Sequence, residues 1–248
     1  MIETKYDVDQ ASFVRKADKM CVLFMGRNNC DASLKAFSHL QRLGFEVVFV
    51  KSKARGEALP EGIENWEGDY IFCFRSLFVL PGYLIDRARI AAINFHPAPT
   101  EYPGSGCLNF ALYDEADNYG VTAHLMNERV DNGKILECRR FPILKSDTVD
   151  SLLDRTHLKL LNLFYDVTTE IGTDGKKYVD KKLVESANKT WSGKARKLSE
   201  LNKLQTVNIH ATREEIERVV RATFTELFPP KIVVHGFEFF LKSPVRNP

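Results

Sequence analysis

The stretch INFHPAP, Ile93 to Pro99, places an asparagine and an ionisable histidine two residues apart at the end of an apolar run. Pro97 removes a backbone donor and favours an extended conformation at His96. Side chains two residues apart on a strand point to the same face, so Asn94 and His96 project together. Open α/β sheets place their chemistry at the carboxyl ends of strands. A strand end whose polar side chains only cap the backbone is the alternative, and this stretch alone leaves both open.

Apolar runs of strand length alternate with helical patterns around this stretch. We predict strands at residues 21–25, 45–50, 70–74, 91–95, 119–126 and 134–141, and helices at residues 31–43, 81–88, 107–113 and 147–171. This alternation predicts an α/β fold, a Rossmann-like and mostly parallel sheet covered on both faces. The turn after the first strand, Gly26 to Asn29, does not match the dinucleotide fingerprint and therefore disfavours NAD.

The composition of the chain changes after the longest helical pattern. This pattern has Asp147 as its expected N-cap and is broken by Gly172 and Gly175. We predict a catalytic domain over residues 1–171, with residues 1–19 as an extension. We predict a small C-terminal α+β subdomain over residues 172–248, with an amphipathic helix at 212–228 and a β-hairpin around Gly236.

Bulk composition limits the classes of function. A net charge of +2 over 248 residues is too small to predict a polyanion-binding surface, and no apolar run approaches the roughly 20 residues that span a bilayer. The first 20 residues lack the apolar core of a secretion signal. Five cysteines without CxxC spacing, and histidines without ligand spacing, indicate a reduced cytoplasmic protein with no metal site.

A third ionisable group lies in the loop NERVDNGKI, where Asp131 precedes Asn132 and Gly133 in a turn that tolerates left-handed backbone conformations. A carboxylate there could reach His96 if the loop folds back over the end of the fourth strand. Such an aspartate would orient the imidazole and stabilise its charged form. An aspartate that satisfies only its own turn is the alternative.

Four stretches, taken together, give the chain a resemblance to a known enzyme family: INFHPAP, YPGSG (102–106), YGVTAHLM (119–126) and ERVDNGKIL (128–136). Their order and separations resemble those of the formyltransferase family, whose members use N10-formyltetrahydrofolate. That family includes glycinamide ribonucleotide, methionyl-tRNA and nucleotide-sugar formyltransferases. The resemblance covers roughly residues 21–141.

The resemblance implies a catalytic triad of Asn94, His96 and Asp131. Asn94 would donate its amide to the developing oxyanion, His96 would accept or relay the amine's proton, and Asp131 would orient His96. The resemblance also implies N10-formyltetrahydrofolate as co-substrate, with its pterin held by backbone groups of the segment Leu77, Phe78, Val79 and Leu80. The Asp131 loop would close over that pterin.

The C-terminal part resembles the tail of nucleotide-sugar N-formyltransferases, because Arg221-Ala222 precedes a Phe228-Pro229-Pro230 turn and a short hairpin. This implies an amino sugar linked to a nucleotide as substrate, such as a dTDP-4-amino-4,6-dideoxyhexose, for surface polysaccharides such as O-antigen or lipopolysaccharide. The weaker candidates for substrate contacts are Tyr102, Gly104, Ser105, Gly106, His124, Trp191, Lys194 and Arg196.

The hairpin at residues 232–241 is a candidate homodimer contact, because a short apolar strand pair is marginally stable unless it packs on something. Nucleic acid is not expected as a partner, since the lysine-rich stretch 176–203 would give a thin electrostatic footprint. Two alternatives stay open. One is a formyltransferase acting on another amine, such as glycinamide ribonucleotide or methionyl-tRNA. The other is a folate- or nucleotide-binding module without catalysis.

Overall fold

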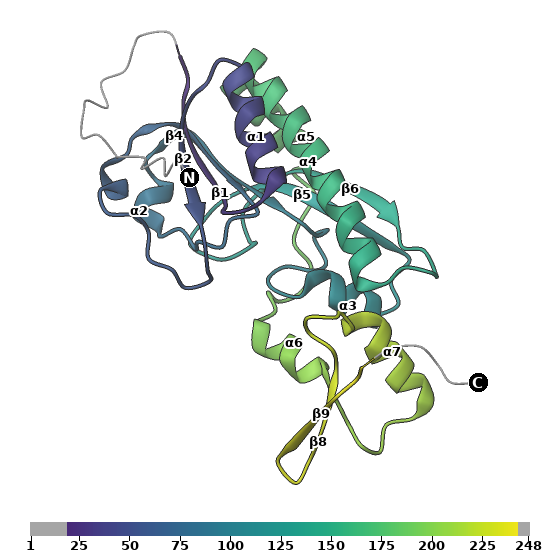
Figure 1. Ribbon diagram of the computed structural model, residues 1–248. Helices are drawn as coiled ribbons and strands as arrows, with labels where there is room; N and C mark the ends of the chain where they lie inside the picture. The colour runs from purple at the N-terminus through teal and green to yellow at the C-terminus, as the bar shows by residue number, and fades with distance from the viewer. Residues whose placement is uncertain (1–18, 243–248) are drawn as a thin grey trace.

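The computed structural model describes residues 19–242 and is built on one twisted six-stranded sheet (Figure 1). Its strand order is β2-β1-β3-β4-β5-β6, with β1 to β4 parallel and β5 and β6 antiparallel. The strands are β1 (Cys21–Arg27), β2 (Glu46–Ser52), β3 (Gly68–Phe74), β4 (Ala88–His96), β5 (Asn118–Leu125) and β6 (Ile135–Pro142). The expected mostly parallel α/β sheet is confirmed.

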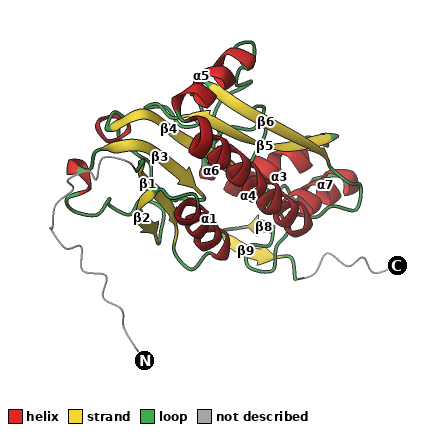
Figure 2. Cartoon of the chain, turned by 90° about the horizontal axis from the view of Figure 1, so that it is seen from above, coloured by secondary structure: helices red, strands yellow, loops and turns green. Residues whose placement is uncertain are grey.

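Helices cover both faces of this sheet. The helices α1 (Asp31–Arg42) and α4 (Val149–Asp174) pack side by side on one face (Figure 2). The short α2 (Gly82–Ile85) and the 3-10 turn η1 (Ile63–Asn65) pack in the core cluster on the other face. Because strands between two helical layers are shielded on both sides, β3 is buried at every position from Gly68 to Phe74. This burial explains the unbroken apolar run read in the sequence.

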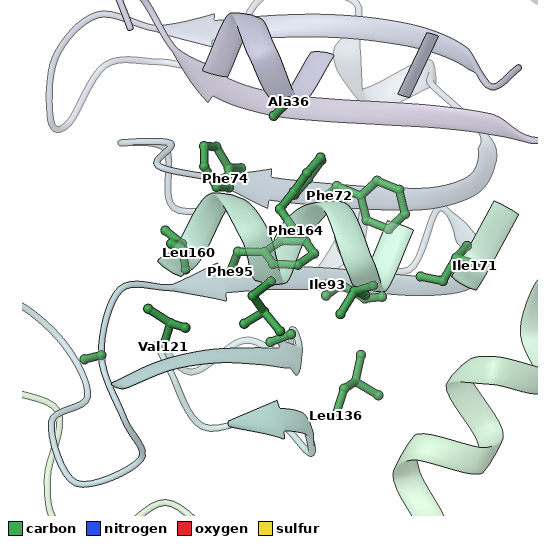
Figure 3. Packing of buried hydrophobic residues seen from close by; sticks show 14 of the residues in the cluster. Ala36, Phe72, Phe74, Ile93, Phe95, Val121, Leu136, Leu160, Phe164 and Ile171 are labelled. Atoms are coloured by element: carbon green, nitrogen blue, oxygen red, sulfur yellow. The ribbon is translucent and has the colours of Figure 1, made fainter. Parts of the chain in front are cut away.

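The largest core cluster surrounds Phe164 of α4. The centroid of its ring lies 5.1 Å from that of Phe74 and 4.7 Å from that of Phe95 (Figure 3). The ring also contacts those of Phe24 and Phe72. Phe164 is fully buried. Phe95 lies between Asn94 and His96 and points to the opposite face of β4. The aromatic cluster therefore anchors the carboxyl end of β4.

Two details of α4 differ from the sequence-based expectation. Its N-cap is Thr148 rather than Asp147: Thr148 Oγ1 accepts from the Ser151 amide and Ser151 Oγ accepts from the Thr148 amide. The helix also runs through Gly172 and ends only at Gly175, where φ is +55°. Packing of the buried Ile171 against the core outweighs the helix-breaking tendency of Gly172.

The predicted short helix at 81–88 was too long, since α2 ends at Ile85 and Ala88 already begins β4. The predicted helix at 212–228 was too long as well. It is α7 (Arg213–Thr223), with Thr212 as N-cap, and it ends at Phe224. The second of these helices was overextended because apolar side chains, Phe224, Leu227 and Phe228, continue beyond the point at which the backbone leaves the helix.

Beyond α4, the chain forms α5 (Lys176–Glu185), α6 (Leu198–Leu204), α7 and a second sheet of order β7-β8-β9. The strands of this sheet are β7 (Thr206–Val207), β8 (Lys231–Val234) and β9 (Phe237–Phe240). α5 packs on α4 and β6, and α7 packs on α3 (Cys107–Tyr113). The expected small α+β part is therefore present. The predicted domain boundary after residue 171 stays a prediction.

Within residues 19–242, no helix is long and apolar enough to cross a membrane, and no group of histidine, cysteine and acidic side chains has metal-binding geometry. No disulfide joins the five cysteines, all of which lie in this range. The expected extension, residues 1–19, lies almost entirely outside the described part of the chain.

Candidate active site

The carboxyl end of β4 brings the polar pair of INFHPAP beside β5. Asn94 is paired with His124 in the antiparallel register, and His96 with Thr122. The side chains of His96 and His124 are buried, whereas Asn94 is partly exposed. β4 is the last parallel strand before the sheet turns antiparallel, and α/β enzymes bind their ligands at the carboxyl ends of such strands.

Asp131 joins this group from the loop between β5 and β6. Its φ of +46° places it in the left-handed region, where aspartate is one of the few tolerated side chains. Gly133 is required two residues later, because a Cβ built there would lie 1.7 Å from the Leu125 carbonyl oxygen. The loop therefore folds back over the sheet edge, as the sequence suggested.

The Asp131 carboxylate connects all the polar groups of the site. Its Oδ2 accepts from the Gly104 amide at 2.8 Å and lies 3.3 Å from His96 Nδ1. Its Oδ1 accepts from Asn94 Nδ2 at 3.3 Å and lies 3.4 Å from His124 Nε2. With the carboxylate only 8% exposed, these contacts replace the water it loses.

His96 is held in its charged form. Nδ1 faces the Asp131 carboxylate and Nε2 lies 3.0 Å from the Tyr102 carbonyl oxygen. Both partners can only accept, so both ring nitrogens carry a proton. Burial by itself would lower the pKa of His96, but Asp131 above all, together with Cys107 and the Tyr102 carbonyl, raises it to about 9.

The same pairing acts on the carboxylate. Burial by itself would raise the pKa of Asp131, but the His96 imidazolium above all, with the Gly104 amide, outweighs it and lowers the pKa to about 2. The pair is therefore ionised at neutral pH, as a buried imidazolium beside a buried carboxylate. Such a pair offers a fixed positive charge at a site that water scarcely reaches.

We expect His96 to titrate near pH 9 in the folded protein, because the imidazolium is stabilised there. Its folded pKa lies above the ordinary value of about 6.5. Its contribution to the free energy of unfolding is therefore complete below pH 6.5 and is lost as the pH rises through about 9. Proton NMR of the imidazole resonances checks this.

His157 is the internal contrast in that spectrum, since burial and the nearby Arg75 and Arg27 lower its pKa to about 4. In Asp131→Asn the His96 titration should move down toward or below 6.5. A His96 resonance that titrates near 6.5 in the unchanged protein would contradict the ion pair.

The Asn94 amide is engaged on its nitrogen side. Nδ2 lies 3.1 Å from His124 Nε2 and 3.3 Å from Asp131 Oδ1, which uses both of its N–H groups. His124 is oriented to accept, because its Nδ1 donates to the Leu125 carbonyl at 2.8 Å. Among residues 19–242, no hydrogen-bond donor reaches Asn94 Oδ1. The carbonyl of Asn94 is thus the unused polar atom of the group.

The loop after β4 completes the site through its backbone. The Gly104 amide donates to Asp131 at a φ of +90°, and the Tyr102 carbonyl accepts from His96. Cys107, the first residue of α3, donates its thiol to the Gly104 carbonyl and lies 3.8 Å from His96 Nε2. The sequence singled out Tyr102 and Gly104 for substrate contacts, but here they also hold the ionised pair.

Other sequence candidates divide into two groups. His124 and Trp191 lie in the site, since the indole ring is edge-on to both His96 and His124. Arg196 instead places its guanidinium over the Phe110 ring, 3.9 Å from the centroid, and Lys194 is exposed. The substrate contacts predicted for Ser105, Gly106, Lys194 and Arg196 stay predictions.

The segment Leu77 to Leu80 lies between the ends of β3 and α2 and is anchored by serines. The Leu77 amide donates to Ser52 Oγ at 2.9 Å and the Phe78 amide to Ser76 Oγ at 3.2 Å. Leu80 is buried in the core, whereas Val79 is 74% exposed. The predicted pterin contacts of this segment would therefore use its carbonyls and the Val79 amide.

That segment faces the Asp131 loop. A Cβ built on Gly82, the first residue of α2, would lie 2.7 Å from Glu128 Oε1, so the Glu128 side chain rests against this backbone. The helix that follows Leu77 to Leu80 and the loop that carries Asp131 are thus neighbours in space.

Two contributors were missed by the sequence analysis. Cys107 was noticed only as one of five cysteines, and the Tyr102 carbonyl carries no side-chain signal at all. The placement of Cys107 three residues after Gly104 was the one available clue. A glycine turn running into a helix presents the first helical side chain to the preceding loop.

Comparison with known proteins identifies the family of the chain. Residues 2–168 match the model of the formyl transferase family. The chain belongs to the formyl transferase family. The match covers about two thirds of the chain and includes Asn94, His96 and Asp131, so the resemblance seen in the sequence is confirmed and the protein is a formyltransferase.

Similar proteins extend over the C-terminal part as well. A GDP-perosamine N-formyltransferase of Brucella melitensis is 21% identical over 230 residues, 91% of this chain and 83% of its own length. Among solved structures, a sugar N-formyltransferase from Shewanella shares the fold with a TM-score of 0.68 at 18% identity, covering 92% of this chain and 99% of its own. An N-formyltransferase from Helicobacter canadensis, in complex with folinic acid and dTDP-3-aminofucose, has a TM-score of 0.62 at 14% identity, covering 89% and 86%.

Proposed function

We propose that this formyltransferase transfers the formyl group of N10-formyltetrahydrofolate to the amine of a nucleotide-linked amino sugar. The observation that carries the proposal is the buried His96–Asp131 ion pair beside the partly exposed Asn94, at the carboxyl end of β4. The likeness to a GDP-perosamine N-formyltransferase over 91% of the chain supports the sugar amine, because it includes the C-terminal part.

The reaction forms a bond between the amine nitrogen and the formyl carbon and breaks the bond from that carbon to the donor nitrogen. One amine proton is lost, and the donor nitrogen gains one. Negative charge develops meanwhile on the formyl oxygen. We assign its stabilisation to the His96 imidazolium, whose Nε2–H would exchange the Tyr102 carbonyl for that oxygen.

Asn94 and Asp131 take the remaining roles. Both N–H groups of Asn94 are engaged at rest, so its Oδ1 is the atom that we expect to accept an N–H of the incoming amine. Asp131 keeps His96 charged, and we assign to it the collection of the amine proton, directly or through a water molecule. These roles differ from the sequence-based expectation, in which Asn94 donated to the oxyanion and His96 accepted or relayed the proton of the amine.

The residues present fit a folate donor. N10-formyltetrahydrofolate would supply the formyl carbon when bound. Leu77 to Leu80 offer unused carbonyls and the Val79 amide beside partly buried apolar side chains, and Glu128 brings the Asp131 loop against α2. The folinic acid bound to the Helicobacter canadensis enzyme is consistent with a folate in this fold.

A panel of amines tests the substrate class. We expect formylation, detected by mass spectrometry with N10-formyltetrahydrofolate as donor, of one dTDP- or GDP-linked amino sugar, with dTDP-4-amino-4,6-dideoxyhexoses as the first choice. Glycinamide ribonucleotide and methionyl-tRNA belong in the same panel. Turnover of either of these with silence on every sugar would overturn the proposed substrate. Binding of nucleotide sugar without turnover would favour the non-catalytic module.

We also propose that the protein forms a homodimer through its second sheet. β9 is the edge strand, and all four of its residues are exposed. Phe237 and Phe239 point to the same face and are 70% and 61% exposed, while Leu227 and Phe228 are exposed in the segment between α7 and β8. Phe240, on the opposite face of the strand, is 57% exposed as well.

Exposed aromatic rings gathered in this way mark an interaction surface, and a standard protein interface buries roughly 800 Å² per partner. A second copy is the occupant that this surface fits, because an unpaired edge strand can pair antiparallel with its own copy. A cytoplasmic location and a role in O-antigen or lipopolysaccharide synthesis remain part of this proposal.

Phe237→Ser with Phe239→Ser should convert the dimer into a monomer, because the change removes the apolar face of β9. Sedimentation velocity at micromolar concentration measures this. Leu158→Ser, on an equally exposed position of α4, is the control and should leave the dimer intact. A monomeric unchanged protein, or a dimer that survives both serine substitutions, would contradict the proposed interface.

A further inference from the structure

The segment Trp191 to Arg196, which we call the strap, connects α5 to α6 and lies outside the residues that match the family model. It runs along the loop that follows β4. The Ser192 amide donates to the Thr100 carbonyl at 3.0 Å, and the Arg196 amide donates to the Pro103 carbonyl at 3.1 Å. The strap is thus joined to the loop that holds His96.

The strap lies so close to the loop after β4 that position 104 of the loop must be a glycine. Gly104 forms a parallel bridge with Arg196, and a Cβ built on Gly104 would lie 2.4 Å from the Arg196 carbonyl oxygen. The Arg196 carbonyl also accepts from the Ser105 amide at 2.8 Å. Since the Gly104 amide donates to Asp131, the backbone that supports the carboxylate is itself fixed by the strap.

Trp191 connects the strap to the ionisable groups. Its ring centroid lies 5.6 Å from that of His96 at an interplanar angle of 70°, and 4.9 Å from that of His124 at 86°. Its indole N–H donates to the Gly133 carbonyl at 2.8 Å, two residues beyond Asp131. One side chain therefore contacts both imidazoles and the loop that presents the carboxylate.

We propose that Trp191 is a positioning residue, which fixes the His96 ring and the Asp131 loop relative to each other and keeps water from the ion pair. The proposal rests on the proposed function of His96 and Asp131. A bulky apolar ring beside an imidazolium lowers the local dielectric and so strengthens the pairing with the carboxylate. Trp191 was expected from the sequence only as a weaker candidate for a substrate contact.

The contacts of the indole favour positioning over stacking. The N–H is already used by Gly133, and the ring is packed against two imidazoles within the protein. A residue engaged in this way acts through His96 and Asp131. Its replacement should therefore slow the chemical step and shift the titration of His96, whereas loss of a nucleotide contact would raise only the KM for the sugar nucleotide.

A fluorescence titration tests the contact without any substrate. The sequence contains two tryptophans, and Trp66 is the other one, so Trp66→Phe leaves Trp191 as the only indole. A protonated imidazole in contact quenches indole emission. We expect the emission of Trp66→Phe to rise with a midpoint near pH 9, the raised pKa of His96.

The groups that face this pair are Asp131, His124 and the Cys107 thiol. Cys107→Ser separates a thiol titration from that of His96, and it should leave the midpoint in place. His96→Gln should abolish the rise. Emission that stays flat between pH 7 and 10 in Trp66→Phe would overturn the contact, whether or not the protein turns over a sugar nucleotide.

Kinetics then distinguish positioning from substrate contact. Trp191→Ala should lower kcat by up to about 10²-fold, as small misplacements of reacting groups do, with little change in the KM for the amine. It should also lower the pKa of His96 measured by NMR. Trp191→Phe keeps the ring contacts but loses the hydrogen bond to Gly133. It should therefore restore part of the kcat and part of the pKa of His96.

Ser192→Ala is the matched control, because Ser192 holds the loop through its backbone alone and its side chain is exposed. Its kcat and its His96 titration should match those of the unchanged protein. A Trp191→Ala variant with an unchanged kcat and an unchanged His96 titration would overturn the proposal, as would a rise in amine KM alone. If no amine is turned over at all, the proposed function fails, and the two titrations still decide the role of Trp191.

Discussion

Asp131→Asn is expected to lower kcat for formyl transfer by roughly 10²–10⁴-fold, the range typical of losing a group that manages proton transfer. The substitution keeps the size of the side chain and removes its charge. His96 then loses the partner that keeps it protonated, and the Gly104 amide loses its carboxylate acceptor. Steady-state kinetics with the best amine of the panel measures the effect.

Thermal unfolding of the same variant separates chemistry from folding. The buried His96 is left without its counter-ion, so some loss of stability at neutral pH is expected, and it should shrink at high pH where His96 is neutral in both proteins. Asp166→Asn, at an exposed carboxylate on α4, is the control for removing a charge. A kcat within a few-fold of the unchanged enzyme would contradict the role assigned to Asp131.

Phe164→Ala is expected to have the largest effect on stability, a loss of about 3–5 kcal/mol in the free energy of unfolding. The ring is fully buried and contacts four other phenylalanines, so its removal leaves a cavity at the centre of the core. Phe95 is among those neighbours, and the end of β4 should loosen with it. Urea unfolding followed by circular dichroism measures the loss.

Leu158→Ala is the matched control, because it shortens a large side chain on the same helix at a position that is 60% exposed. We expect it to change stability by less than about 0.5 kcal/mol. Equal losses in the two variants would mean that the helix, rather than the aromatic cluster, limits stability.

The central part of the site could be predicted because its signals are local. A strand end, a proline and two polar residues two apart fix Asn94 and His96 on one face, whatever the rest of the chain does. Asp131 needed a long-range step, the folding of the β5–β6 loop over β4. The sequence indicated only a turn that tolerates left-handed conformations, whereas the structure shows the left-handed Asp131 and the close approach at Gly133.

The remaining parts depend on contacts between distant segments, which no local pattern encodes. Trp191 lies 95 residues after His96, and its placement follows from the strap pairing with the loop at Gly104. The Tyr102 carbonyl is backbone and carries no residue signal. α4 runs past Gly172 because tertiary packing outweighs intrinsic propensity, a cost of about 1 kcal/mol that burial of Ile171 readily exceeds.

Transfer of a carbon-13-labelled formyl group tests the central claim most directly. The protein would be incubated with N10-[13C]formyltetrahydrofolate and the sugar nucleotide panel, and the products read by NMR and mass spectrometry. Our account predicts that the label appears on the nitrogen of one amino sugar, and that Asp131→Asn slows its appearance at least 10²-fold. Folate binding with no label on any sugar amine, or a label that appears equally fast with Asp131→Asn, would contradict it.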